Sequence, residues 1–238
     1  MLGRFLEYSV NTPDIRASLD YYDKLGFTQA LVGEAWAHPY AVVTDGRIHI
    51  GLHEQAIRAP SLTFVKPNLA RHLAAFEQLG LEFEFSRLGE DVFNELGWLD
   101  PSGHLIRLIE ARTFSPVKRS ARDASVCGYF QEIALPAVER LAAKEFWEKF
   151  GFVGIDEEGS LPHIACTSDS IDIGLYDPAD LSAPALVFDV EDIGGALARL
   201  AEAGVVPCGR VPPLARRPAA VLTAPEGTLI LLLSAAAT

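Results

Sequence analysis

The segment S-L-D-Y-Y-D-K-L-G-F, residues 18–27, closes with a glycine, Gly26, between two apolar residues, Leu25 and Phe27. Its apolar side chains recur at helical spacing, and a glycine supplies the left-handed conformation on which many helices stop. Three later segments end in the same way: Q-L-G-L at 78–81, K-F-G-F at 149–152 and E-A-G-V at 202–205. The sequence therefore predicts four helices with a common ending.

The spacing of these endings shows how the helices are grouped. The four glycines stand at positions 26, 80, 151 and 204, so the successive gaps are 54, 71 and 53 residues. Two nearly equal gaps around a longer one are typical of two paired units, a connector and two more units. We expect a first domain at residues 1–113, a linker at 114–127 and a second domain at 128–236.

Strands surround each predicted helix and repeat with it. I-H-I-G-L-H at 48–53 parallels I-D-I-G-L-Y at 171–176, and A-P-S-L-T-F at 59–64 parallels A-P-A-L-V-F at 183–188. Each unit is a strand, a helix and three strands. Because one such unit cannot bury its apolar faces alone, two are expected to close a curved sheet with the helices outside. The predicted fold class is α+β: two tandem domains, each with two βαβββ modules that form a cup.

Local signals place the helix starts and their buried faces. Residues 11–14 offer a side-chain cap with Pro13 at the first helical position, and Pro67 opens the second helix. The apolar stripes expected in the core are Ile15, Leu19, Tyr22 and Leu25; Leu69, Leu73, Phe76 and Leu79; Val138, Ala142, Phe146 and Phe150; and Ile193, Leu197 and Leu200.

Composition narrows the class of partner. The formal net charge of −12 argues against nucleic acid and against an anionic membrane surface, since both need a basic face. The one basic stretch, Pro116 to Arg122, is interpreted as a solvated connector. No apolar run approaches the ~20 residues of a membrane span, residues 1–7 lack a signal-peptide pattern, and three scattered cysteines suit a reducing, cytoplasmic location. A small organic ligand or another protein chain, including a second copy of this chain in a homodimer, remains as the partner.

Four motifs lie in register with the repeat: Asp14 with the 18–27 segment, W-L-D-P-S-G-H-L-I at 98–106, E-F-W-E-K-F-G-F at 145–152 and A-P-E-G-T-L-I at 224–230. Together they resemble the vicinal oxygen chelate superfamily, which includes glyoxalase I, extradiol dioxygenases and the bleomycin and fosfomycin resistance proteins. The resemblance covers nearly the whole chain. It implies cup-shaped domains and, in many members, a divalent metal such as Zn, Mn or Fe used by a lyase or dioxygenase.

The resemblance also implies where the metal ligands would stand. By position they fall on the first strand of each unit and on the strand after the D-P-x-G turn: Glu7, Ser61 and Arg107 in domain one, and Glu132, Ala185 and Leu231 in domain two. Only the two glutamates are good ligands. Two unit charges ~4 Å apart interact by roughly 4 kcal/mol at an effective dielectric near 20, so a divalent ion beside Arg107 meets about twice that as repulsion. We expect Arg107 to pair with Glu7 or with an anionic ligand, and the second cup to bind no metal.

Strand alternation predicts which other side chains enter the cups. His49, Gly51 and His53 share one strand face, beside Glu7 and Ser9. Trp36, His38 and Tyr40 edge the same cup, where aromatic rings can stack on a flat ligand or pack in the core. In the second cup Glu132, Asp172 and Tyr176 are interpreted as a rim of acids without a basic neighbour.

Three functions fit these residues. The first is a binding protein that holds a small organic molecule in the cup of domain one, with no metal. The second is an enzyme: a lyase or dioxygenase with a metal held by Glu7, His49 and His53, or a metal-free acid–base catalyst that uses Glu7. The third is a degenerate pair of domains that serves as an interaction module.

Overall fold

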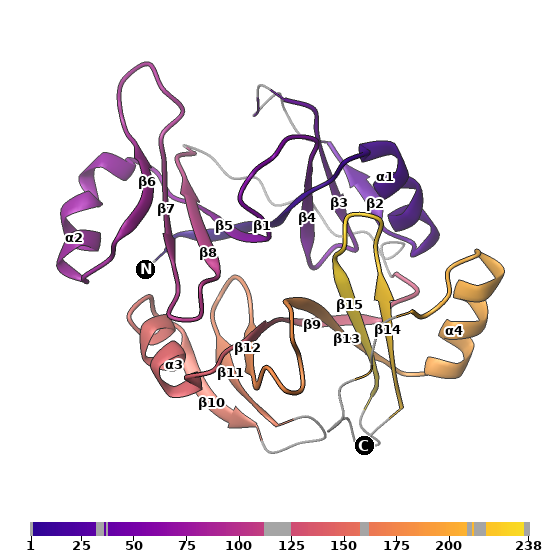
Figure 1. Cartoon of the computed structure of the whole chain (residues 1–238). Helices are drawn as coiled ribbons and strands as arrows, with labels where there is room; N and C mark the ends of the chain where they lie inside the picture. The colour runs from indigo at the N-terminus through magenta and orange to yellow at the C-terminus, as the bar shows by residue number, and fades with distance from the viewer. Residues whose placement is uncertain are drawn as a thin grey trace.

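The computed structural model describes residues 2–31, 36, 38–111, 125–157, 162–208, 211 and 218–235. Most of the predicted linker, with the basic stretch from Pro116 to Arg122, lies outside these residues. Within them the chain forms two mixed sheets, one above the other in Figure 1. No helix in the described ranges has the length and apolar character needed to cross a membrane.

The first sheet has eight strands in the order β2-β3-β4-β1-β5-β8-β7-β6. Strand β1 is parallel to β4 on one side and antiparallel to β5 on the other. The two modules therefore meet where β1 pairs with β5. Figure 1 shows α1 and α2 at opposite ends of this sheet. The elements are β1 (Arg4–Asn11), α1 (Ile15–Lys24), β2 (Thr28–Ala30), β3 (Tyr40–Thr44), β4 (His49–His53), β5 (Ser61–Val65), the 3-10 helix η1 (Leu69–Arg71), α2 (Leu73–Gln78), β6 (Phe83–Arg87), β7 (Glu95–Leu99) and β8 (Leu105–Ile109).

The second sheet repeats this order in its seven strands, β10-β11-β12-β9-β13-β15-β14. Its elements are β9 (Tyr129–Pro136), α3 (Arg140–Glu148), β10 (Val153–Glu157), β11 (His163–Thr167), β12 (Ile173–Tyr176), β13 (Ala185–Val190), α4 (Ile193–Glu202), β14 (Ala219–Thr223) and β15 (Leu229–Ser234). The predicted α+β fold with two cup-like sheets is confirmed. The fourth module shows a strand, a helix and two strands within the described residues.

Two helix starts differ from the prediction. The first helix begins at Ile15, after Asp14, whose carboxylate accepts hydrogen bonds from the backbone N–H groups of Arg16 and Ala17. Pro13 therefore precedes the cap instead of standing at the first helical position, because the Asp14 side chain is the acceptor for these N–H groups. In the second module a 3-10 turn, η1, follows Pro67, and α2 begins only at Leu73.

The predicted face of α3 is also wrong in part. Val138 is 80% exposed and Ala142 is exposed, whereas Ala143 and Trp147 are buried beside Phe146. The helix is turned so that its large ring, Trp147, faces the sheet, since burying an indole removes more apolar area than burying an alanine. The other three stripes pack against or within the core, although Leu79 at the end of α2 is exposed.

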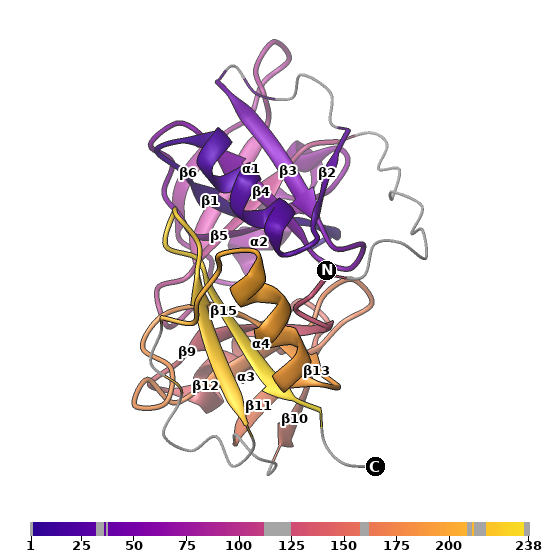
Figure 2. The same cartoon turned by 90° about the vertical axis from the view of Figure 1, so that its right-hand side faces the viewer.

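One apolar core runs through both halves of the chain. Trp98 and Phe150, one from each half, lie with ring centroids 6.0 Å apart. The turn before β15 reaches across to α1, where Glu226 accepts hydrogen bonds from Ser18 Oγ at 2.8 Å and Tyr22 OH at 2.7 Å. Figure 2 shows this turn and α1 at the junction of the two halves. The halves are therefore joined by apolar and polar contacts.

Candidate functional site

Glu7 lies at the bottom of the first cup. Its strand, β1, runs beside β4, where Gly51 stands opposite Ser9. A Cβ at position 51 would overlap the Glu7 carboxylate, so the glycine leaves the space that this carboxylate fills. Glu7 is only 1% exposed. A buried carboxylate needs hydrogen-bond donors around it.

Three side chains supply these donors. Ser9 Oγ donates to Glu7 Oε1 at 2.7 Å, Tyr40 OH donates to Oε2, and His53 Nε2 lies 3.1 Å from Oε1. Burial raises the pKa of the Tyr40 phenol, and the Glu7 carboxylate raises it further, so the phenol keeps its proton. Ser9 also bonds Thr63 Oγ1 at 2.7 Å. Glu7, Ser9, Tyr40 and His53, all candidates from the sequence, thus form one network.

The network continues to the surface of a pocket through a second histidine. His38 Nε2 lies 2.8 Å from His53 Nδ1. His38 lines the pocket, whereas His53 is fully buried. A hydrogen-bonded path therefore leads from Glu7 through His53 to His38.

Arg107 pairs with a residue that the sequence did not single out. Its Nε lies 2.9 Å from Glu95 Oε2 and its Nη2 bonds the same oxygen, while Arg87 Nη1 lies 3.0 Å from Glu95 Oε1. The predicted Glu7–Arg107 ion pair is wrong. The two residues stand on β1 and β8, and Thr63 on β5 lies between them in the sheet register.

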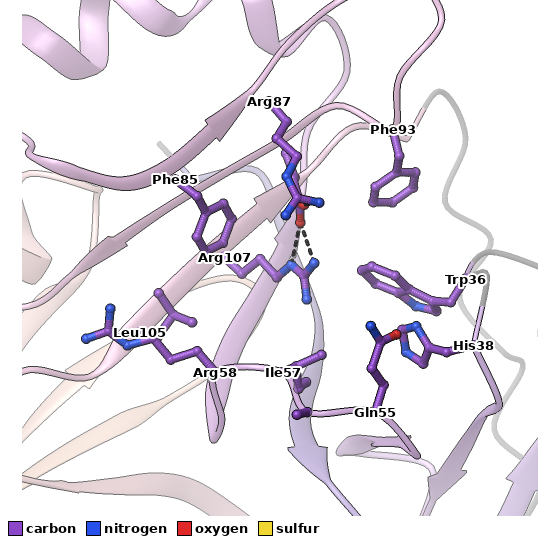
Figure 3. A pocket seen from close by; sticks show the side chains of 12 residues that line it. Trp36, His38, Gln55, Ile57, Arg58, Phe85, Arg87, Phe93, Leu105 and Arg107 are labelled. Atoms are coloured by element: carbon purple, nitrogen blue, oxygen red, sulfur yellow. Dashed lines mark hydrogen bonds and ion pairs between the residues drawn. The ribbon is translucent and has the colours of Figure 1, made fainter.

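The pocket beside this ion pair has a volume of about 470 Å³. Arg107 lies over the Trp36 ring, 4.5 Å from its centroid, and Figure 3 shows the guanidinium pointing into the space between Trp36 and Ile57. Of the predicted ligand-binding residues, Trp36 and Arg107 line the pocket, whereas Glu7 is buried and is not part of the lining. The full lining is Trp36, His38, Gln55, Ala56, Ile57, Arg58, Phe85, Arg87, Phe93, Glu95, Leu105 and Arg107.

The second cup holds a related network in which the tyrosine and the histidine have exchanged strands. Tyr176 OH donates to Glu132, and His163 Nε2 lies 3.3 Å from Glu132 Oε1. In the first cup tyrosine is on β3 and histidine on β4; in the second, histidine is on β11 and tyrosine on β12. Gly174, like Gly51, leaves room for the carboxylate.

The interpretation of these acids as a rim is wrong for Glu132, because that residue is 7% exposed and has a histidine partner. Asp172 precedes β12 and is half-buried; burial raises the pKa of its carboxyl group, and nearby Glu132 raises it further. Around Glu132 the cup is lined by buried apolar side chains: Ala134, Leu181, Ala185, Val187, Val221, Leu231 and Leu233.

Solved structures show the same architecture over nearly the whole chain. A homoprotocatechuate 2,3-dioxygenase variant from B. fuscum, in complex with HPCA, has a TM-score of 0.64 at 14% identity and covers 99% of this chain and 72% of its own. The Mn(II)-bound glyoxalase from Novosphingobium aromaticivorans has a TM-score of 0.63 at 16% identity, with 98% and 82% covered. The chain has the vicinal oxygen chelate fold. No family model and no curated protein matches its sequence.

The vicinal oxygen chelate fold implies a metal position, and the residues found there do not fit a metal. The register across β1, β5 and β8 aligns Glu7, Thr63 and Arg107, so Thr63 replaces Ser61 in the predicted set. In the second sheet the row is Glu132, Val187 and Leu231, with Val187 in place of Ala185. A carboxylate, a hydroxyl and a guanidinium offer one good ligand and one repelling charge.

The alternative metal site was Glu7, His49 and His53. His49 begins β4 on the face that also carries Gly51 and His53. Across the described ranges, no group of three His, Cys, Asp or Glu side chains could hold a metal ion. The two carboxylate oxygens of Glu7 instead form hydrogen bonds with Ser9, Tyr40 and His53.

Sequence reasoning missed several residues of the two sites: Arg58, Thr63, Phe85, Arg87, Phe93, Glu95 and His163. Phe85 illustrates why. Acidic and aromatic residues alternate at 82–85, which predicts a strand with Glu82 and Glu84 in solvent, as the structure shows. A register shift between Phe83 and Phe85 turns the second ring into the pocket. Such a bulge has no signal in this sequence. For His163 the internal repeat offered a signal: it begins β11 as Tyr40 begins β3, and its ring lies 4.5 Å from that of Tyr176 on β12, much as the Tyr40 ring lies 4.7 Å from that of His53 on β4.

Proposed function

We propose that the protein binds a flat, negatively charged organic molecule in the first cup without a divalent metal. The observation that carries this proposal is Arg107, which stands where the fold places a metal ligand, is fixed by Glu95 and lies over Trp36. A guanidinium held in this way recognises a carboxylate or a phosphate. The fixed positive charge would attract and orient an anionic ligand, as a bound metal ion does in other members of the fold.

The pocket supports both parts of this description. Among the described residues that line it are three arginines, Arg58, Arg87 and Arg107, and one acid, Glu95. Even with Glu84 paired to Arg58, one positive charge is left in excess, although the chain is acidic. Three aromatic rings also border it, and rings of this kind pack on flat molecules. In the dioxygenase structure of this fold, a small organic molecule, HPCA, is bound. A cup of about 470 Å³ is large enough for a ligand of one ring with short substituents.

Arg107→Gln is expected to weaken binding of an aromatic carboxylate about 10- to 100-fold, because a hydrogen bond to a charged group contributes about 1.5–3 kcal/mol. Phenylpyruvate serves as the probe and the uncharged phenylacetamide as its comparison. Binding is followed by tryptophan fluorescence, since Trp36 borders the pocket while Trp98 and Trp147 are fully buried. Arg16→Gln on the outer helix α1 is the matched control and should bind like wild type.

Dialysis against EDTA should change neither the affinity for phenylpyruvate nor the melting temperature. Metal-dependent binding would lose affinity after this treatment and regain it with Zn²⁺, Mn²⁺ or Fe²⁺, and that result would overturn the proposal. Equal affinity of wild type and Arg107→Gln for the carboxylate would also contradict it.

A further inference from the structure

We propose that the first cup also catalyses proton transfer, with His38 as the base that removes a proton from a carbon atom next to a carbonyl group of the bound anion. The inference rests on the proposed function, since the anion must first occupy the pocket. Its basis is the path from Glu7 through His53 to His38, which begins at a buried carboxylate and ends at a ring that lines the cup.

The hydrogen bonds assign the protons along this path. Glu7 accepts from Ser9 and Tyr40, so His53 Nε2 donates to it as the third partner. In neutral His53 the other ring nitrogen, Nδ1, is then an acceptor. His38 Nε2 must donate to it across 2.8 Å, and this leaves His38 Nδ1 with a free lone pair. His38 Nδ1 has no hydrogen-bond partner among the residues that the structure describes.

A lone pair fixed in this way is what a general base needs. The buried carboxylate orients the first imidazole, the first orients the second, and positive charge that develops on His38 is stabilised through the same bonds. His38 is the catalytic residue in this proposal because it would touch the substrate. Glu7 and His53 are positioning residues, since they act only through His38.

The surroundings keep His38 ready to accept a proton. Burial lowers the pKa of its imidazole, and the neighbouring His53 and the Arg107 guanidinium lower it further. The aromatic ring of Trp36 packs against it, with centroids 5.6 Å apart. A base with a lowered pKa is unprotonated over a wider pH range, so activity should rise with pH, and the midpoint of that rise should lie below the ordinary histidine pKa.

The proposed reaction balances without any further reactant. His38 Nδ1 takes the proton, the electrons of the broken C–H bond form a C=C bond, and the carbonyl electrons move to oxygen. The enolate oxygen carries the negative charge, which the pocket arginines stabilise. If the proton on His38 is then delivered to the enolate oxygen, the net change is tautomerisation. If it is first replaced by a proton from water, and that proton is added to carbon, the net change is exchange with the solvent. Aromatic 2-oxo acids combine the ring, the carboxylate and the acidic carbon that this site requires.

The test is exchange of the methylene protons of phenylpyruvate in D₂O containing EDTA, followed by proton NMR. Wild type should exchange them faster than buffer alone, and His38→Gln should be slower than wild type by about 10²- to 10⁴-fold, the range for loss of a general base. In His38→Ala, added imidazole should restore part of the rate in proportion to its concentration. His72→Gln, at the start of α2 on the outside of the first sheet, is the matched control and should retain the wild-type rate.

A second variant tests the path itself. In Glu7→Gln the amide can donate to His53 Nε2 and so reverse the direction of both hydrogen bonds, which would place a proton on His38 Nδ1. The exchange rate should fall and its pH dependence should change, while nitrogen NMR of the imidazoles should show the altered tautomers. A merely structural role for Glu7 would leave the tautomers and the pH dependence as they are.

The outcomes separate this inference from the proposed function. If phenylpyruvate binds but wild type exchanges its protons no faster than buffer, or if His38→Gln exchanges them as fast as wild type, the inference is wrong and the binding function stands. If phenylpyruvate does not bind at all, the proposed function fails and the inference fails with it.

Discussion

Glu95→Leu is expected to lower the free energy of unfolding by about 3 kcal/mol, the lower end of the range for a buried ion pair that loses one partner. Glu95 is 3% exposed and holds both Arg107 and Arg87, and Arg107 itself is only 12% exposed. Without Glu95, the Arg107 guanidinium keeps its charge at a largely buried position and loses the carboxylate that pairs with it. The lower end applies because Arg107 lines the pocket and remains partly exposed to solvent.

This loss should appear as a melting temperature lower by roughly 6–12 °C in a chain of this size. Glu95→Leu combined with Arg107→Leu should recover part of it, since the stranded charge is then absent. Glu84→Gln is the control, because Glu84 pairs with Arg58 at the surface, where an ion pair contributes at most about 1 kcal/mol. A melting temperature for Glu95→Leu equal to that of wild type would show that Glu95 does not hold Arg107 in solution.

Gly51→Ala should destabilise the protein by about 2–4 kcal/mol, because the new methyl group would occupy the place of the Glu7 carboxylate. The carboxylate must then move away from Tyr40 and His53, and each buried polar group that loses its partner costs about 1–3 kcal/mol. Backbone strain does not contribute, since Gly51 does not have a positive φ. Chemical unfolding monitored by circular dichroism measures the change.

Two further variants identify the cause. Gly194→Ala, in the first turn of helix α4, adds the same methyl group where it would make only an ordinary van der Waals contact, and it should not destabilise the protein. Glu7→Ala removes the group that the new methyl would strike. Gly51→Ala should therefore cost much less in a Glu7→Ala background; an equal cost in both backgrounds would mean that the glycine serves some other purpose.

The architecture could be predicted from the sequence because its determinants are local and occur several times. Glycines 26, 80, 151 and 204 all have positive φ, so each helix ending is a backbone requirement that only a few residue types satisfy. The face of α3 could not be predicted with the same success. Apolar residues occupy more than one side of that helix, and which side is buried depends on the sheet against which Trp147 packs.

The candidate site was predictable where strand alternation sufficed. Alternation places Glu7 and Ser9 on one face of β1 and His53 on the matching face of β4, and the structure joins all three. It does not say which strands are neighbours. The pairing of β7 with β8 brings Glu95 within reach of Arg107, whereas β5 separates Arg107 from Glu7. The partner of a charged residue in a sheet depends on strand order, which no local pattern encodes.

The contact of Glu226 with α1 bears on how such a chain evolves. By the internal repeat, Ser18 and Tyr22 correspond to Ala143 and Trp147, and Glu226 corresponds to Ser102. In a homodimer of half-length chains, symmetry would force both copies of this contact to carry the same residues. After two copies are fused in one gene, each contact can acquire mutations independently. One contact is a carboxylate with two hydroxyls, and the residues at the corresponding places of the other are an alanine, a tryptophan and a serine, so the two contacts are chemically different, as only a fused chain allows.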